Sequence, residues 1–239
     1  NPEFWEEHVP NCFLEALEKL PDKEKFDAVI VDEGQDFREL WWTTIDSLFK
    51  DPSNKECYYV FYDKHQDLFV EKVVVPDGEL GTPYKLNYNC RNTEQIASHC
   101  ANIIGIESKV ASHSPTGSKP EILHAQDFSD AFTQAGKILQ QWLNSKTGLE
   151  PRQVVVLTSK NSGRNFLQKK SKINLTNDFD DWRENKGVLF STWQSFKGLE
   201  ADAIIIIEFP LDDAKRNTNR YVGRSRAKHL LKIIETSSD

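Results

Sequence analysis

The pattern of apolar and polar residues predicts two short strands in the first quarter of the chain. Residues 26–33, "FDAVIVDE", and residues 57–63, "CYYVFYD", are rich in β-branched and aromatic residues, and each run ends in acidic residues. Residues 39–49 between them are expected to form a helix, and residues 3–20 carry apolar positions at helical spacing. Buried strands that alternate with helices predict a parallel α/β sheet.

The rest of the chain repeats this alternation. Helices are expected at 92–105 and 131–143, and strands at 153–159, 187–194 and 202–209, whereas 227–235 fits a strand or a helix. The polar stretch 170–185 is expected to be a surface excursion. Turn residues at 73–83 place a domain boundary near residue 80, which gives domains 1–80 and 81–239.

Composition and charge narrow the class of protein. The 239 residues are 38% hydrophobic and 28% charged, as in soluble globular proteins. The longest apolar runs fall far short of the ~20 residues of a membrane-spanning helix. Four cysteines without CxxC spacing fit free thiols in a reducing compartment, so we expect a cytoplasmic protein with no membrane partner. A net charge of -7 argues against a protein surface that is basic throughout and binds nucleic acid with most of its area. It still allows a local groove lined by Lys and Arg.

Acidic residues directly after the first predicted strand are the first candidates for chemistry. In parallel sheets ligands bind at the carboxyl ends of strands, where Asp32, Glu33, Asp63 and Thr192 are expected. An aspartate followed by a glutamate suits phosphate hydrolysis: the first holds a hydrated Mg²⁺, and the second accepts a proton from the attacking water. A solvated acidic turn is the alternative. The apolar run before Asp32 favours the catalytic interpretation.

Five segments then resemble a known family. "VIVDEGQD" resembles the Walker B element, motif II, of superfamily I helicases of the UvrD/Rep type. Four further segments resemble motifs III, IV, V and VI of the same family, in the family's order. They are residues 61–69, 86–97, 191–202 and 220–231, respectively. The resemblance implies a RecA-like P-loop NTPase fold, here a partial first domain and a second RecA-like domain. It also implies ATP and Mg²⁺ as cofactors. The partner that it implies is single-stranded nucleic acid, with DNA favoured over RNA.

The resemblance assigns roles at the nucleotide, in the cleft between the two domains. Asp32 matches the metal ligand and Glu33 the catalytic base, while Gln66 matches the motif III glutamine that senses the γ-phosphate. Arg91 and Arg226 match arginines that reach the γ-phosphate and neutralise its charge in the transition state. In the same family a glutamate at the position of Glu200 bonds the ribose.

Other residues match nucleic-acid contacts. Thr192 and Lys197 match the motif V loop. Phe69, the last residue of motif III, is an aromatic that is expected to stack on bases or to fill a core. The sequence departs from the family at Tyr62, Cys90, Gln194 and Ser225, which weakens the expectation for nucleic-acid contacts more than for the nucleotide site. The interval from Arg91 to Thr192 leaves little room for a large accessory subdomain.

The chain contains no GxxxxGK[ST] phosphate loop. We therefore expect that loop, and the missing N-terminal part of the first domain, outside this chain, as the absence of methionine also suggests. The chain alone is then expected to be inactive. Two alternatives stay open: a helicase-derived binding or regulatory module that never hydrolyses ATP, and an unrelated metal-dependent phosphohydrolase using Asp32, Asp36 and Asp63.

Overall fold

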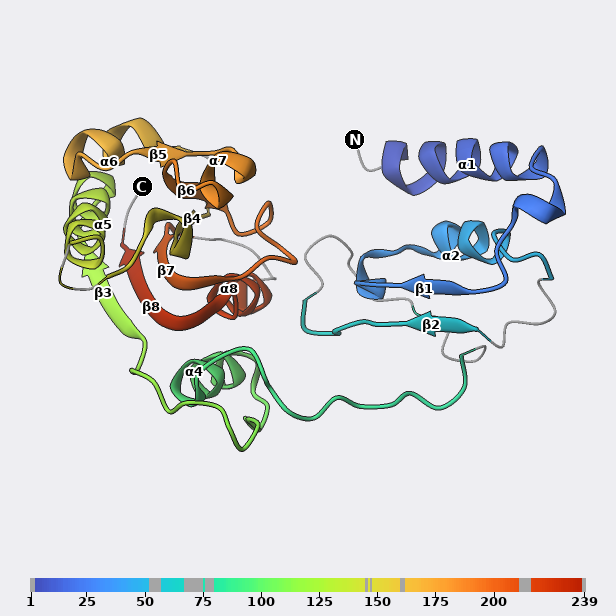
Figure 1. The fold of residues 1–239 in the computed structure, drawn as a ribbon, viewed down its shortest axis with the longest axis horizontal. Helices are drawn as coiled ribbons and strands as arrows, with labels where there is room; N and C mark the ends of the chain where they lie inside the picture. Colours follow the sequence, from blue (N-terminus) through green and yellow to red (C-terminus); the bar gives the residue numbers. More distant parts are fainter. Residues whose placement is uncertain are drawn as a thin grey trace. The chain divides into compact units, whose positions relative to one another are not determined.

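The chain forms two compact units. The computed structural model describes residues 3–51, 57–66, 75, 80–144, 146, 148–159, 162–210 and 216–237. The units are Asn1–Leu86 and Asn87–Asp239 (Figure 1). Each has its own apolar core. The division falls after Leu86, whereas the sequence pattern placed it near residue 80. The assignment of the two units to helicase domains stays a prediction.

The first unit is a small parallel sheet with helices. Its elements are η1 (Phe4–His8), α1 (Val9–Glu18), η2 (Asp22–Glu24), β1 (Val29–Val31), η3 (Gly34–Asp36), α2 (Glu39–Asp46) and β2 (Tyr58–Val60). β1 and β2 pair in parallel, with Val29 opposite Tyr58.

The expectation that β1 is a buried strand is wrong for one of its faces. Val31 packs with Trp42 of α2, but the side chain of Ile30 points the other way and is 69% exposed. Successive side chains of a strand alternate between the two faces of a sheet. Within the described residues of this unit, the core cluster covers the face that carries Val31.

The second unit is an α/β domain with a larger sheet. Its elements are α4 (Glu94–Ile104), β3 (Glu121–Ala125), α5 (Phe128–Trp142), η4 (Pro151–Gln153), β4 (Val154–Thr158), α6 (Arg164–Ser171), β5 (Leu175–Thr176), α7 (Phe179–Arg183), β6 (Val188–Thr192), β7 (Ala201–Glu208), α8 (Arg216–Arg224) and β8 (Ala227–Thr236). Six strands run parallel in the order β3-β8-β7-β4-β6-β5. The predicted α/β class, with parallel sheets flanked by helices, is confirmed.

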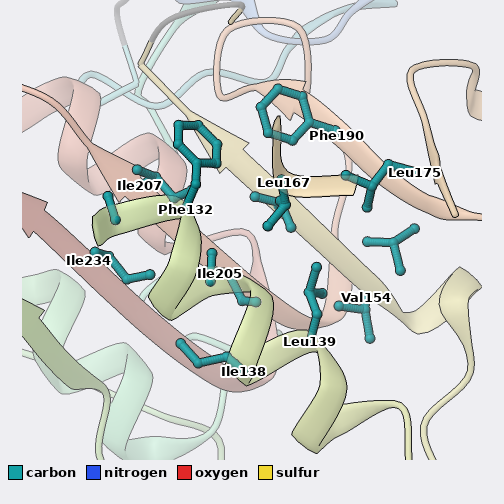
Figure 2. Packing of buried hydrophobic residues seen from close by; sticks show 14 of the residues in the cluster. Phe132, Ile138, Leu139, Val154, Leu167, Leu175, Phe190, Ile205, Ile207 and Ile234 are labelled. Atoms are coloured by element: carbon teal, nitrogen blue, oxygen red, sulfur yellow. The ribbon is translucent and has the colours of Figure 1, made fainter. Parts of the chain in front are cut away.

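Helices cover both faces of this sheet. Val154 and Val156 of β4 face a cluster with Phe132 and Leu139 of α5 and with Leu167 of α6 (Figure 2). The alternate β4 residues, Val155 and Leu157, face a second cluster with side chains of α4 and α7. Full burial of one such side chain contributes about 1.5–3 kcal/mol relative to exposure. The central strands are therefore apolar on both faces, as their sequences predict.

Two expectations for this unit are settled by packing. Residues 227–235 form a strand, β8, because they lie between β3 and β7 and place Ile233 and Ile234 on opposite faces. The expectation of a surface excursion at 170–185 is wrong in part, since this stretch contains β5 and α7 and buries Trp182. Asp178 begins α7 by accepting the backbone N–H groups of Asp180 and Asp181. None of the described helices is both long enough and apolar enough to cross a membrane.

Candidate functional site

In the first unit, acidic residues gather where β1 and β2 end. Asp32 directly follows β1, and Asp63 follows β2 by three residues; the strands are parallel, so both lie at the carboxyl edge. Glu33 turns the chain out of β1 in a left-handed backbone conformation, with φ 54° and ψ 40°. A non-glycine residue held there costs on the order of 1–3 kcal/mol, and such strain is found at functional sites.

Gln35 connects the predicted site residues of this unit. Its side chain is fully buried; its Nε2 donates to Glu33 Oε2, and its Oε1 accepts the backbone N–H of Asp63 at 2.9 Å. Asp63 Oδ2 in turn accepts Gln66 Nε2 at 2.8 Å. Glu33 and Gln66 therefore belong to one hydrogen-bonded chain. The sequence analysis missed Gln35, whose signal is a glutamine between acidic residues just after a buried strand.

The turn after Glu33 is held close to β2. Gly34 N–H donates to the carbonyl of Phe61 at 2.9 Å. A Cβ added to Gly34 would lie 2.6 Å from Val60 Cγ1, which is too close for any other residue without a shift. Glycine at this position therefore lets the Glu33 turn contact the neighbouring strand directly.

Asp32 offers one exposed carboxylate to a metal ion. One of its oxygens accepts the backbone N–H of Glu33 at 2.9 Å. Groups of three or more His, Cys, Asp or Glu placed to hold a metal do not occur within the described ranges. Mg²⁺ commonly binds through one or two carboxylates, with water and phosphate oxygens completing its shell. Asp32 fits that use, provided that a nucleotide supplies the phosphate.

In the second unit, three distant segments meet at the amino edge of the sheet. Glu200 precedes β7 and Arg226 precedes β8, and the N–H of Ala201 donates to the carbonyl of Arg226 at 3.1 Å. Arg91 Nε donates to Glu200 Oε2 at 2.9 Å, and the side chains of this pair are 42% and 45% exposed. The structure thus places Arg91 beside Glu200, and Glu200 next to the backbone of Arg226.

Asn92 holds these segments together. Its side chain is 3% exposed, and its Nδ2 donates to the carbonyls of Ser225 at 2.9 Å and Ala227 at 2.6 Å. Its Oδ1 accepts Asn89 Nδ2 at 2.7 Å. The two carbonyls flank Arg226, and Asn92 itself follows Arg91. This residue was not foreseen, because the two carbonyls that it bonds are 133 and 135 residues away in the sequence.

Arg226 lies inside the unit. It is 1% exposed, and its Nε donates to the carbonyl of Val222, in α8, at 3.0 Å. Burial raises the pKa of the nearby Cys100 thiol to about 12, while the positive charges of Arg224 and Arg226 act in the opposite direction. In this conformation Arg91 is the half-exposed arginine of the predicted pair. Because Arg226 is buried, its side chain would have to turn outward to meet a phosphate.

Charged side chains also gather at the opposite, carboxyl edge, near the ends of β7 and β8. Arg224 pairs with Glu208 at 2.7 Å and with Glu235 at 3.0 Å, and Arg220 adds bonds to the same two carboxylates. Arg224 Nη1 lies 3.1 Å from His99 Nε2 of α4. Burial and the Arg224 charge hold the pKa of His99 below its usual value, against the opposing effect of Glu235. Sequence analysis did not single out this cluster.

The predicted nucleic-acid residue Thr192 lies apart from Arg91 and Glu200. Thr192 ends β6 and is level with Ile207 of β7, because both are opposite Thr158 of β4. Ala201 begins β7 six residues before Ile207, so at about 3.3 Å per residue Thr192 is roughly 20 Å away along the strands. Lys197 lies in the turn between β6 and β7. Phe69 lies outside the described residues.

Comparisons with known proteins add a likeness of fold. Neither a protein-family model nor a curated protein sequence matches the chain. The C-terminal domain of a possible DNA helicase from Lactobacillus plantarum WCFS1 is similar in structure, with a TM-score of 0.48 and 20% identity. The match covers 62% of this chain and 88% of that one. At this level the likeness carries no conclusion about activity.

Proposed function

We propose that the chain is the C-terminal part of an ATP-dependent, UvrD-like superfamily I helicase or translocase that acts on single-stranded nucleic acid, in the first place DNA. The observation that carries the proposal is the meeting of three distant segments in the second unit. Arg91, Glu200 and the backbone of Arg226 lie together there, and each comes from a different motif of the resemblance. The hydrogen-bonded chain from Glu33 to Gln66 adds support from the first unit.

The residues of the first unit have complementary roles in this proposal. Bound Mg²⁺ would neutralise charge on the β- and γ-phosphates, and Asp32 is the residue that would hold it. Glu33 would accept the proton of the attacking water, with its carboxylate oriented by the Gln35 amide. Gln66 would contact the γ-phosphate, with its side chain positioned by Asp63.

The residues of the second unit would respond to nucleotide. Arg91 is bonded to Glu200, so it would exchange a carboxylate partner for a phosphate oxygen. Glu200 would then be available to a ribose hydroxyl. Arg226 would add a second positive charge after its side chain turns outward. The exchange at Arg91 replaces one charge-assisted hydrogen bond by another.

The test uses the full-length protein that supplies the phosphate loop. Wild type should hydrolyse ATP faster when single-stranded DNA is added. Glu33→Gln should abolish turnover while nucleotide binding is kept, because the amide retains the shape but accepts no proton. Glu39→Gln, on the exposed side of α2, is the matched control and should behave as wild type. Hydrolysis by Glu33→Gln at the wild-type rate would refute the mechanism.

A second candidate is a helicase-derived module that binds nucleic acid without turning over ATP. Two observations favour it: Arg226 is buried, and the chain has no GxxxxGK[ST] loop. The same experiment separates the two functions. A full-length protein that binds single-stranded DNA, with no ATP hydrolysis in its presence, would establish the module and exclude the enzyme.

A further inference from the structure

A cationic surface follows α6 in the second unit. Arg164, Lys169, Lys170 and Lys172 fall within nine residues that contain no acidic residue, in a chain of net charge -7. Across the part of the chain that the structure describes, none of the four forms an ion pair with a carboxylate. Their charges are therefore not neutralised by neighbouring carboxylates.

Stability of the helix explains only part of this pattern. Lys169 and Lys170 lie in the last turn of α6, where a positive charge is favourable by about 0.3–1 kcal/mol. Arg164 is the first residue of the helix, where a positive charge is unfavourable. Its Nη1 is held by Asn177 Oδ1 at 2.6 Å. Lys172 follows the helix in a left-handed conformation, with φ 59°.

Two adjoining hollows lie along this cationic surface. The larger, of about 910 Å³, is lined by Lys169 and Lys172 and by the amide side chains of Gln168 and Asn174. The smaller, of about 500 Å³, is lined by Arg164 and Asn177. Asn165 and Phe166 line both, so the hollows adjoin. The name α6 surface refers to the following lining residues: Phe128, Arg164, Asn165, Phe166, Gln168, Lys169, Lys172, Asn174 and Asn177.

Aromatic rings form part of the smaller hollow. Phe128 and Phe166 line it, with ring centroids 5.8 Å apart, and both are half-buried. Lys170 Nζ lies 5.3 Å from the centroid of the Phe166 ring. A partly exposed ring beside positive charges can stack on a nucleobase while the cations meet phosphates. The amides of Asn165 and Asn177 can both donate to and accept from the edges of bases.

The smaller hollow lies at the same edge of the sheet as Thr192. Arg164 follows β4 and Asn177 follows β5, and in the sheet β6, which ends at Thr192, lies between these two strands. The α6 surface is therefore continuous with an edge at which the sequence already predicted a nucleic-acid contact. A duplex hides the faces of its bases, whereas a single strand presents them, so rings favour the single strand.

We propose that the α6 surface is a binding track for single-stranded nucleic acid, with Arg164, Lys169 and Lys172 at phosphates and Phe166 against a base. This inference rests on the proposed function, from which it takes single-stranded nucleic acid as the class of partner. It adds a binding surface for that partner beyond Thr192 and Lys197. An acidic polypeptide is the competing occupant, because it would meet the same cations.

The test measures binding of a fluorescein-labelled single-stranded oligodeoxynucleotide to the 239-residue chain by anisotropy, over a series of salt concentrations. The variant Arg164→Ala/Lys169→Ala/Lys172→Ala should weaken binding at least 10-fold at low salt. It should also lower the slope of log K against log salt by about 2, since each phosphate contact on a single strand contributes ~0.7. Phe166→Leu, which keeps apolar volume, should weaken binding about 5-fold or more with the slope unchanged.

The matched control is Lys109→Ala/Lys119→Ala/Arg183→Ala, which removes two lysines and one arginine elsewhere in the same unit. It should change affinity less than about 2-fold. Equal weakening by both triple variants, no binding by wild type, or equally effective competition by polyglutamate would overturn the α6 track. Loss of binding in Lys197→Ala but not in the α6 variant would also overturn it, while leaving the proposed function intact. Absence of ATP hydrolysis in the full-length protein would refute the enzyme without affecting these binding results.

Discussion

The side-chain nitrogen of Asn92 lies 2.9 Å from the carbonyl oxygen of Ser225, although 133 residues separate the two in sequence. The same nitrogen donates to Ala227, so it satisfies the two carbonyls on either side of Arg226. The buried Asn92 amide therefore ties together the segments that carry Arg91 and Arg226, beside the bond from Thr93 N–H to the Lys228 carbonyl. Both arginines are proposed to meet the same phosphate, so their spacing matters for that role.

Asn92→Ala should destabilise the second unit by about 1–3 kcal/mol, because it leaves buried carbonyls without their donor. Urea unfolding of the 239-residue chain, followed by tryptophan fluorescence, measures the change. Asn217→Ala, at an exposed position of α8, is the control and should stay within about 0.5 kcal/mol of wild type. If the two variants unfold at the same urea concentration, the Asn92 bonds contribute nothing to stability.

Gly34→Ala should destabilise the first unit by about 1–3 kcal/mol through overpacking, since the new Cβ would lie 2.6 Å from Val60 Cγ1. The double variant Gly34→Ala/Val60→Ala makes room for that methyl group and should be more stable than the sum of the two single changes. Thermal unfolding of all four proteins gives the coupling. Additive losses would show that the contact with Val60 is not the reason for glycine.

Arg224→Met should cost about 3–5 kcal/mol, because it leaves the buried Glu208 carboxylate without its closest partner. Arg220 contacts the same two carboxylates, but its side chain is 23% exposed, so Arg220→Met should cost less stability. Adding Glu208→Gln to Arg224→Met should recover part of the loss, since no buried charge is then unpaired. An unchanged or larger loss in that double variant would contradict this account. Urea midpoints provide the comparison.

The stability of the second unit should fall as the pH drops below about 6.5, the ordinary pKa of histidine. Burial and Arg224 lower the pKa of folded His99, so below that pH the unfolded chain binds a proton that the folded chain does not. The stability that neutral His99 contributes to the folded state is fully present above the pKa of His99 in the unfolded chain. It is lost as the pH falls through the lower pKa of His99 in the folded chain. His99→Gln should show a smaller decrease in urea midpoint between pH 7.5 and 5.5. Identical pH profiles would exclude a role for His99.

The strands that the sequence located well are those buried on both faces. β7 was expected at 202–209 and occupies Ala201–Glu208, because its isoleucine run fits only the centre of a sheet. β5 was missed, since two residues at the edge of the sheet need no long apolar run. Ile30 was expected to be buried, but sequence alone does not show whether a second layer covers its face of the sheet.

Among the site residues, those that the sequence predicts are recognisable from their neighbours in the sequence, and those that it misses depend on distant contacts. Asp32 and Glu33 are recognisable because they directly follow a strand. Gln35 and Asn92 also bond backbone groups far along the chain, and a single sequence does not display such pairs. The burial of Arg226 was not predicted either, although its bond to the Val222 carbonyl spans only four residues.

The 239-residue chain by itself should bind Mg-ATP more weakly than about 1 mM, which corresponds to about -4 kcal/mol. A phosphate loop normally supplies several backbone N–H groups and a lysine, and this sequence has no such motif. Of the proposed phosphate ligands, Arg91 is bonded to Glu200 and Arg226 is buried. Mg²⁺ is poorly held by Asp32 alone, because it sheds its waters reluctantly. Isothermal titration calorimetry gives the affinity, with phosphate release by Glu33→Gln as the background. A micromolar dissociation constant, or release above that background, would show that these residues form a complete nucleotide site without a phosphate loop.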